Sequence, residues 1–532
     1  MYLGKHMPLW LDISDNLVFD ELVGEIDVDV IVVGGGVAGL SIGAMLKMEG
    51  LSVAVLESRR IGHYITGTTT AKVSYTSSLI YGYVLSTFGK EIALKFKEAY
   101  FTGFNNILSV VEELNIDCDL RRIPFYILSE EDSKKDMVDS EYEALKEMDI
   151  PGKIVYEVPF PYEHVNKALV HENQMELNPI KYLHGLARYI NNNNDNNNSN
   201  TNSNTITNNN SNTNSNTNSN TNKNHSYVFE KSKVVDVDDD GEFKIANTNK
   251  GIVRGKNIVI ATNSPIYDPD SLYKHMNQNK SHGLGVMSKK PATKAMFVVF
   301  NPFHTLRSTP SPKGDMWIVL GEHHSIDDST DRWDFYNNLR QYTEDLFEVE
   351  SFDYFWTGGD NLTEDRLAII GESSQKGVYI ATGFNSWGVN SAMISAQIIT
   401  DLILKRDNNY SEIFSPLRFK DKESKTEENK INSFKNQKIE FTESVGKTII
   451  EMTNNQAKLV ESDLGTLAIY KDNDSNVFVL EGKCSHMGCN LHFDNAERIW
   501  ECPCHGSVFD YKGNVIRAPA IENLKNMDSS GS

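Results

Sequence analysis

Cysteine is scarce in this chain, and long apolar runs are missing. Five cysteines in 532 residues are too few for the disulfide framework of a small secreted domain. The most apolar stretch, residues 31–46, is crowded with glycine and is shorter than the roughly 20 residues that a membrane-spanning helix needs. Residues 1–27 lack the basic start and apolar centre of a signal peptide. We therefore expect a cytoplasmic protein without membrane insertion.

Positive charge is also in short supply. Lysine and arginine together number 52 against 73 aspartates and glutamates, which leaves a formal net charge of −21. Such a field repels nucleic acids and anionic lipids, so the charge argues against nucleic acid as a partner. The length and the 39% content of hydrophobic residues predict two or three domains with real cores.

Two changes in composition divide the chain. Residues 191–224 are almost pure asparagine, serine and threonine, which cannot bury enough apolar surface to offset the entropy of ordering, so we predict a disordered insertion in a surface loop. Residues 416–435 are rich in charge and predict a linker. We therefore expect an N-terminal extension over 1–27, a large α/β domain over 28–415, a small all-β domain over 436–525 and a tail over 526–532.

The region after the linker consists of short runs with strand character. The runs are TIIEM (448–452), AKLVE (457–461), TLAIYK (466–471), VFVLEG (477–482), RIWECP (498–503), SVFDY (507–511) and NVIRAP (514–519). Their spacing predicts an all-β domain of roughly ninety residues, which is within the usual size of a domain.

The large domain begins with a dinucleotide-binding pattern. A buried strand at 28–33 is followed by Gly34, Gly36 and Gly39 and then by a helical run to about residue 49. In this pattern the first glycine permits a tight turn, the second lets the backbone approach a pyrophosphate, and the third lets helix and strand pack closely. The sequence therefore predicts a Rossmann-type fold at the front of the chain.

Three further residues complete this pattern. Val37 and Ala38 open the helix, whose N-terminus then faces the phosphates. A second strand at 52–56 ends at Glu57, 23 residues after Gly34, where a carboxylate is placed to bind a ribose diol. Strand, turn, helix, strand and acid together are far more specific than a glycine pattern alone.

Three segments downstream resemble the D-amino acid oxidase-like (DAO) family of flavoproteins. They are SRRIGHYITGTTTAKVS (58–74), KNIVIATNSP (256–265), and WTGGDNLTEDRLAIIG with GVYIATGFNSWGVNSAMISAQIITDLI (356–403). The resemblance implies FAD as cofactor and an α/β fold, in which a Rossmann-type FAD-binding domain carries a mixed-sheet substrate domain. It also implies cofactor contacts from Thr69, Thr70, Val234, Thr262, Gly383, Trp387 and Gly388, with a helix beginning near Gly388.

Four of the five cysteines lie in two short stretches near the C-terminus. Cys484-Ser-His486 and, after fifteen residues, Cys502-Pro-Cys-His505 each offer one thiolate and one imidazole. Rieske centres hold one iron of a [2Fe-2S] cluster with two cysteines and the other iron with two histidines. A zinc site or a pair of structural disulfides would use similar residues and remains the alternative. The fifth cysteine, Cys118, is expected to be a buried core thiol.

The residues around these stretches resemble the Rieske ferredoxin family. They are CSHMGCNL, CPCHGSVF and KGNVIRAPA, the last matching the proline loop. The resemblance implies that Cys484 and Cys502 bind one iron, that His486 and His505 bind the other, and that Cys489 and Cys504 form a disulfide.

One departure from this family concerns the reduction potential. Ser507 is present, but Phe509 stands where the quinol-oxidising complexes often have tyrosine, so one hydrogen bond to the cluster is missing. We therefore predict a potential in the middle of the Rieske range of about −150 to +300 mV, below that of the quinol oxidisers.

The order of the two domains resembles a family of fused FAD-dependent oxidoreductases and suggests a relay. FAD accepts two electrons at once as a hydride, whereas the cluster accepts one at a time. We therefore expect dehydrogenation of a small-molecule substrate, an amine or amino acid, followed by single-electron transfers to the cluster and to an unidentified external acceptor. Arg307 could clamp a carboxylate, and His323 or His324 could line the pocket.

Other functions remain open on the sequence. A non-catalytic electron carrier would use the same cofactors. An NAD(P)H-linked reductase would need a second dinucleotide motif, and the nearest candidate, residues 283–288, follows a polar run and predicts an ordinary loop or strand edge. A Rieske oxygenase would need a further iron site, yet none of the 14 histidines outside the cluster motif form an H-x3-H or H-x4-H pair.

Overall fold

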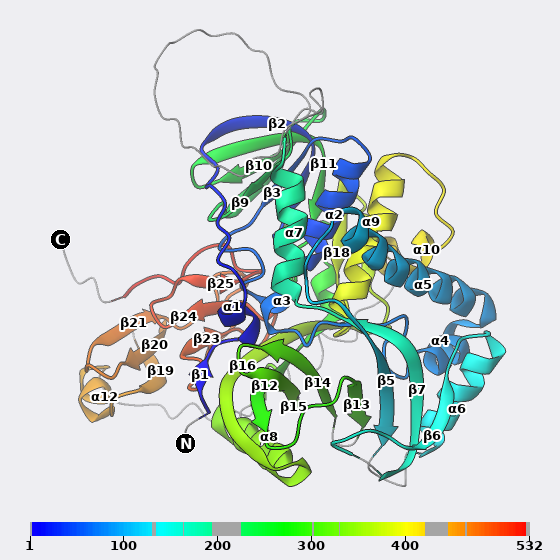
Figure 1. Cartoon of the computed structure of the whole chain (residues 1–532). Coiled ribbons are helices and arrows are strands. Elements are labelled where there is room, and N and C mark those ends of the chain that lie inside the picture. Colours follow the sequence, from blue (N-terminus) through cyan, green and yellow to red (C-terminus); the bar gives the residue numbers. More distant parts are fainter. Residues whose placement is uncertain are drawn as a thin grey trace, which may run out of the picture.

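The computed structural model describes residues 3–129, 135–162, 164–193, 225–300, 303–328, 330–420, 445–462 and 465–527. A large α/β unit carries two sheets with helices packed between and beside them, and a small β unit lies against it (Figure 1). This arrangement confirms the predicted fold class.

The first sheet is a Rossmann-type sheet with parallel central strands. Its order is β17 (Ile369–Glu372), β18 (Val378–Thr382), β11 (Gly251–Ile260), β2 (Gly24–Val33), β3 (Val53–Leu56) and β8 (Tyr227–Phe229), extended by β9 (Val234–Asp239) and β10 (Lys244–Thr248). The pairs from β18 to β8 are parallel, so these strands end at the same edge of the sheet. The strand at 28–33 and the helix to residue 49 are confirmed as β2 and α2 (Val37–Met48), although β2 begins earlier.

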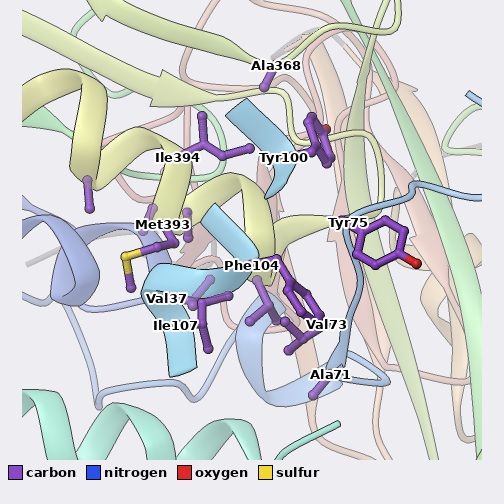
Figure 2. Close-up of a cluster of buried hydrophobic side chains, with 14 of the residues drawn as sticks. Val37, Ala71, Val73, Tyr75, Tyr100, Phe104, Ile107, Ala368, Met393 and Ile394 are labelled. Atoms are coloured by element: carbon purple, nitrogen blue, oxygen red, sulfur yellow. The ribbon is translucent and has the colours of Figure 1, made fainter. Parts of the chain in front are cut away.

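Helices cover one side of this sheet (Figure 1). Helix α2 packs against α7 (Pro179–Asn191) and α9 (Gly388–Ile403), and α5 (Lys90–Glu113) packs on α9. Figure 2 shows the apolar side chains that meet there, among them Val37, Ile107 and Ile394. Burying each such side chain contributes about 1.5–3 kcal/mol. A Cβ at Gly103 of α5 would lie 2.7 Å from Ile394, so glycine permits this close helix contact.

The second sheet is the mixed sheet of the expected substrate domain. Its order is β1 (Lys5–His6), β16 (Val349–Thr363), β12 (Met276–Ser288), β15 (Gly314–Ser325), β14 (His304–Ser311), β13 (Met296–Phe300), β5 (Arg121–Ser129), β7 (His164–Glu176) and β4 (Lys72–Val73), with β6 (Lys153–Glu157) also on β7. Strand β12 lies between β16 and β15, so residues 283–288 form an interior strand rather than the predicted loop or edge.

Further helices complete the large unit. They are α1 (Leu9–Ile13), α3 (Ile65–Thr68), α4 (Tyr81–Phe88), α6 (Lys135–Glu147), η2 (Leu272–His275), α8 (Arg332–Leu346), α10 (Ser411–Phe414) and η3 (Pro416–Phe419). The predicted N-terminal extension belongs to this unit, because β1 pairs with β16 and Trp10 is fully buried. The start of the predicted linker also packs here, since Arg418 pairs with Asp365 at 2.8 Å.

The C-terminal unit consists of two small antiparallel sheets. One holds β19 (Gln456–Ser462), β20 (Gly465–Lys471) and β21 (Val477–Glu481), and the other holds β22 (His492–Asp494), β23 (Ile499–Glu501), β24 (Val508–Asp510) and β25 (Val515–Arg517). Residues 448–452 were predicted as a strand, and this was wrong: they lie in or just after α12 (Val445–Glu451). A short apolar run does not distinguish helix from strand.

Parts of three predicted segments lie outside the described residues. These are 194–224 of the insertion, 421–435 of the linker and 528–532 of the tail. The ends of the insertion are held together, because Asn193 and Ser226 exchange two hydrogen bonds of 2.9 Å. At the tail, the Met527 N–H donates to the Val479 carbonyl at 2.8 Å.

Candidate functional site

A cavity of about 350 Å³ lies between the two sheets of the large unit. It is lined by all but one of the residues that the sequence predicted to contact a dinucleotide: Gly34, Gly36, Val37, Ala38, Glu57, Thr69, Thr70, Val234, Thr262, Gly383, Trp387 and Gly388. The other, Gly39, packs beneath the turn, where a Cβ would overlap the Gly34 carbonyl. Residues from distant parts of the sequence therefore converge on one site.

The glycine-rich turn presents a helix N-terminus to this cavity. Gly34 has φ of 114°, a conformation that favours glycine. Helix α2 begins at Val37, whose N–H donates to the Thr66 hydroxyl at 3.1 Å. Unpaired N–H groups and the helix dipole at such an end favour an anion, so the turn fits a pyrophosphate.

Glu57 ends β3 beside this turn. Its carboxylate accepts hydrogen bonds from the N–H groups of Gly35 and Arg59, each at 2.8 Å. Burial raises the pKa of Glu57, and these hydrogen bonds act against that rise. A fixed acceptor at this place fits a ribose hydroxyl.

The opposite end of the cavity is built from β18, α9 and β16. Helix α9 begins at Gly388, as the sequence predicted, and Gly383 turns the chain with φ of 66°. Asp360 of β16 also lines this end, and burial raises its pKa to about 6. The helix N-terminus places positive potential where a cofactor gains negative charge on reduction.

The substrate sheet closes the cavity with residues that the sequence did not single out. Lys72 of β4 lies against the Thr305 hydroxyl of β14, and both line the cavity beside Leu320. Burial, followed by repulsion from Arg307, holds the pKa of Lys72 well below its ordinary value. This amine therefore stays neutral more readily than an exposed lysine and can accept a proton.

The three candidate substrate residues separate in the structure. His323 lines the cavity, and burial lowers its pKa to about 4. His324 points away and stacks on Phe335 with ring centroids 4.0 Å apart, as expected for adjacent residues of a strand.

Arg307 requires a correction. It does not line the cavity: its guanidinium is buried, pairs with Glu176 at 3.0 Å and lies over the Trp10 ring. The carboxylate that Arg307 binds is therefore one of the protein's own.

The cysteine and histidine stretches form two facing loops in the C-terminal unit. Each loop closes with the same backbone hydrogen bond of 2.8 Å, from Gly488 to Cys484 and from Gly506 to Cys502. The Cys484 and Cys502 thiols lie within hydrogen-bonding reach, and the rings of His486 and His505 are 5.0 Å apart. Within the described part of the chain, the buried Nδ1 of His486 has no hydrogen-bond partner. Two thiols and an available imidazole nitrogen in one place fit a [2Fe-2S] cluster.

Two further cysteines join these loops. Cys489 and Cys504 are linked by a disulfide, with their Cα atoms 6.5 Å apart. The sulfur atoms of Cys489, Cys502 and Cys504 all lie within 4.8 Å of one another. Cys118, by contrast, is buried in the large unit, where burial raises the pKa of its thiol to about 12.

Buried charges fix the C-terminal unit to the large unit. Lys280 of β12 pairs with Asp494 at 2.9 Å and with Glu501 at 2.5 Å, and all three side chains are at most 5% exposed. Arg332 of α8 adds a second cation 3.5 Å from Asp494. Lys280 and Arg332 therefore offset the buried charges of Asp494 and Glu501 across the interface.

The two sites adjoin across this interface. A second cavity of about 820 Å³ is lined by both cluster-loop histidines, and it shares Ser264, Ile266 and Ile521 with the first cavity. Gln278 of β12 joins the two sides, because its amide donates to Ser264 Oγ at 2.8 Å and to the His505 carbonyl at 3.0 Å.

Comparison with known proteins decides the family. The model of the FAD-dependent oxidoreductase family, DAO, matches residues 29–194 and 222–402. The chain belongs to this family. A Rieske [2Fe-2S] domain model matches residues 445–528, so the DAO domain is followed by a Rieske domain.

Relatives and solved structures agree with this division. The chain is 24% identical to the Rieske 2Fe-2S iron–sulfur protein YhfW of Bacillus subtilis (strain 168), over 99% of each chain. It is 38% identical to the chloroplastic cytochrome b6-f complex iron–sulfur subunit of Pisum sativum, over 12% of this chain and 28% of that subunit. Glycine oxidase from Geobacillus kaustophilus is similar in structure, with a TM-score of 0.57, 16% identity and coverage of 74% of this chain and 99% of the oxidase. L-proline dehydrogenase from P. horikoshii is also similar, with a TM-score of 0.54, 16% identity and coverage of 75% and 98%.

The protein is thus a DAO-family oxidoreductase with FAD and a Rieske [2Fe-2S] cluster as cofactors. Among the described residues, no helix is long and apolar enough to cross a membrane. Sequence reasoning missed Lys72, Lys280 and Gln278 as residues of the site. Lys72 alone carried a signal, because it lies two residues after the threonine run in the segment that resembles the DAO family.

The cluster potential is open to a direct test at Phe509. This side chain is fully buried and belongs to the same group of buried hydrophobic side chains as Cys484 and Cys502. We expect Phe509→Tyr to raise the midpoint potential by about 50 mV, because one added hydrogen bond contributes about 1 kcal/mol and a one-electron couple shifts by about 59 mV per tenfold change. An EPR-monitored redox titration measures the shift. An unchanged potential would show that the hydroxyl does not reach the cluster.

Proposed function

We propose that the protein dehydrogenates a small amine or amino acid and passes the electrons to an external acceptor through its Rieske domain. The substrate carbon beside nitrogen loses a hydride to FAD, which leaves an imine, and the two electrons leave singly through the [2Fe-2S] cluster. We further propose that Cys484 and Cys502 bind one iron of this cluster and His486 and His505 the other. We also propose the division of the chain predicted from the sequence, with the DAO domain over 28–415, a linker over 416–435 and the Rieske domain over 436–525.

One observation carries the relay. The cavity lined by the FAD-binding residues is also lined by residues 515–518 of the Rieske domain, and it shares a wall with the cavity that both cluster-loop histidines line. Ser264, Ile266 and Ile521 therefore lie between the two sites. The buried ion pairs of Lys280 support a docked domain, because separating them would leave charges without partners.

The substrate end of the cavity supports an amine. An amine must lose its proton before it can form an imine, and neutral Lys72 is placed to accept that proton. Thr305 holds the lysine from one side, while Leu320 contributes apolar wall. His323, with its lowered pKa, adds a neutral ring rather than a positive charge at neutral pH.

We expect Lys72→Met to slow reduction of the flavin by substrate by about 100-fold, within the 10²–10⁴ range that general acid–base groups contribute. Methionine fills the same buried space without a basic nitrogen, so the fold and FAD content should persist. Anaerobic stopped-flow absorbance measures the rate. Lys97→Met, on the outer side of α5, is the matched control, since its amine contacts carbonyls at the surface. Equal rates in the two variants would rule out Lys72 as the base.

The reaction itself is tested by anaerobic addition of amines, amino acids and NAD(P)H to the holoprotein. Flavin absorbance and low-temperature EPR of the reduced cluster are recorded together. Bleaching of the flavin by one amine, followed by growth of the cluster signal, is the expected result. Reduction by NADH alone would make the protein a reductase, and reduction by none of these would favour an electron carrier.

A further inference from the structure

The Rieske domain completes the wall of the FAD cavity. The residues that it contributes are Val515, Ile516, Arg517, Ala518, Ala520 and Ile521. They belong to β25 and to the proline loop that follows it. Arg517 is the charged residue of this set, and it lies two residues before Pro519, which lines the second cavity.

The surroundings of Arg517 provide hydrogen-bond partners for only part of its guanidinium. The residue is 6% exposed, and its Nε donates to the Gly506 carbonyl at 2.7 Å. In the part of the chain that the structure describes, the buried Nη2 has no hydrogen-bond partner. Burying a charged donor without a hydrogen-bond partner destabilises the folded protein, and an anion bound beside the donor removes much of that cost. The guanidinium of Arg517 is therefore suited to bind an anion.

Among the residues that the structure describes, no carboxylate forms an ion pair with Arg517. The charge of Arg517 helps to lower the pKa of Glu501, but this carboxylate already contacts Lys280 and His492. On the large unit, the guanidinium faces the Tyr64 ring at 5.8 Å and the backbone at Gly359, where a Cβ would lie 2.9 Å from Nη1. Tyr64 and Gly359 are themselves walls of the FAD cavity.

We propose that Arg517, although it belongs to the Rieske domain, is a residue of the FAD site, and that its guanidinium stabilises the negative charge that the cofactor gains on reduction. A fixed cation beside a cofactor favours its reduced state. Because Nε of the same side chain holds Gly506, next to His505, one residue joins the FAD site to the cluster loop. The FAD site is therefore complete only when the Rieske domain is docked.

The test is a redox titration of the flavin in the full-length holoprotein, using dithionite and reference dyes. We expect Arg517→Gln to weaken binding of reduced FAD relative to oxidised FAD about tenfold, which lowers the two-electron midpoint potential by about 30 mV. Arg517→Lys keeps the charge and should retain most of the potential. Lys525→Gln, an exposed lysine of the same domain, removes an equal charge and should change nothing. The titration needs no substrate, so its outcome is independent of the proposed reaction.

A variant on the other side of the interface keeps the test decisive if Arg517→Gln disturbs the cluster loop. Gly359→Ala pushes against Nη1 from the large unit, and we expect a smaller shift of the flavin potential in the same direction. In the Arg517→Gln background that shift should vanish, because both changes act on one guanidinium. Three results would each overturn the proposal. The shifts of Gly359→Ala and Arg517→Gln could be additive in the double variant, or Arg517→Gln could have the same flavin potential as Lys525→Gln. Arg517→Gln could also bind FAD more weakly with an unchanged potential.

Discussion

Lys280→Met is expected to detach the Rieske domain from the DAO domain. The substitution leaves Asp494 and Glu501 buried at the interface without their main cation, and removing one partner of a buried pair costs about 3–5 kcal/mol. Transfer of electrons from flavin to cluster should slow to the rate at which the undocked domain, still tethered by the chain, meets the DAO domain. The measurements are stopped-flow reduction of the cluster and calorimetric melting of the holoprotein.

Two controls separate this effect from a general loss of lysine. Lys280→Arg keeps a cation at the interface and should retain transfer. Lys289→Met removes a lysine just beyond the end of β12, where the pair with Glu348 is exposed and contributes little. If Lys280→Met melts and transfers electrons like Lys289→Met, the interface does not depend on the buried pair.

The pH dependence of this variant has a definite sign. Burial works to raise the pKa of Glu501, but Lys280, together with His492 and Arg517, lowers it below its usual value overall. A depressed folded pKa contributes stability above the unfolded value of about 4.3, and that stability is lost as the pH falls. Without Lys280 the pKa of this buried carboxylate rises, because burial then outweighs more of the remaining favourable charge. The difference in melting temperature between wild type and variant should therefore shrink as the pH is lowered from 7 toward 4.5.

The residues that could be predicted from the sequence are those set by local geometry. Gly34 and Gly36 follow a buried strand and precede a helix, and this short pattern has one structural solution. Helix α9 begins at Gly388 for the same kind of reason, since a strand, a turn and a helix follow one another directly. Cys484 and Cys502 were found because each stands at a fixed spacing from a histidine.

The residues that could not be predicted depend on contacts between distant segments. Arg517 lines the FAD cavity, and Lys280 pairs with Glu501, only because the Rieske domain docks beside β12, and no local pattern reports that docking. Arg307 was misplaced for the same reason, because its partner Glu176 lies on another strand of the sheet. The sequence placed Trp10 in an N-terminal extension. Its burial could not be predicted, because it depends on helices that follow much later in the chain.

Cys484→Ser should remove the Rieske signal and leave the flavin intact. Serine does not supply the thiolate that the iron requires, whereas the loop keeps its backbone hydrogen bond to Gly488 and its disulfide through Cys489. The variant should contain FAD, and dithionite should still bleach it. Reduction of an external acceptor by substrate should fall to background, because the electrons no longer have a one-electron exit.

The matched control is Cys118→Ser in the large unit. That thiol is 1% exposed, and its raised pKa keeps it protonated, so it takes no part in metal binding. It should keep the full EPR signal, iron content and acceptor rate. A Rieske signal that survives in Cys484→Ser would remove this residue from the ligand set. A wild-type protein that binds zinc in place of iron, with no EPR signal after dithionite, would instead assign the four residues to a structural metal and end the electron relay at the flavin.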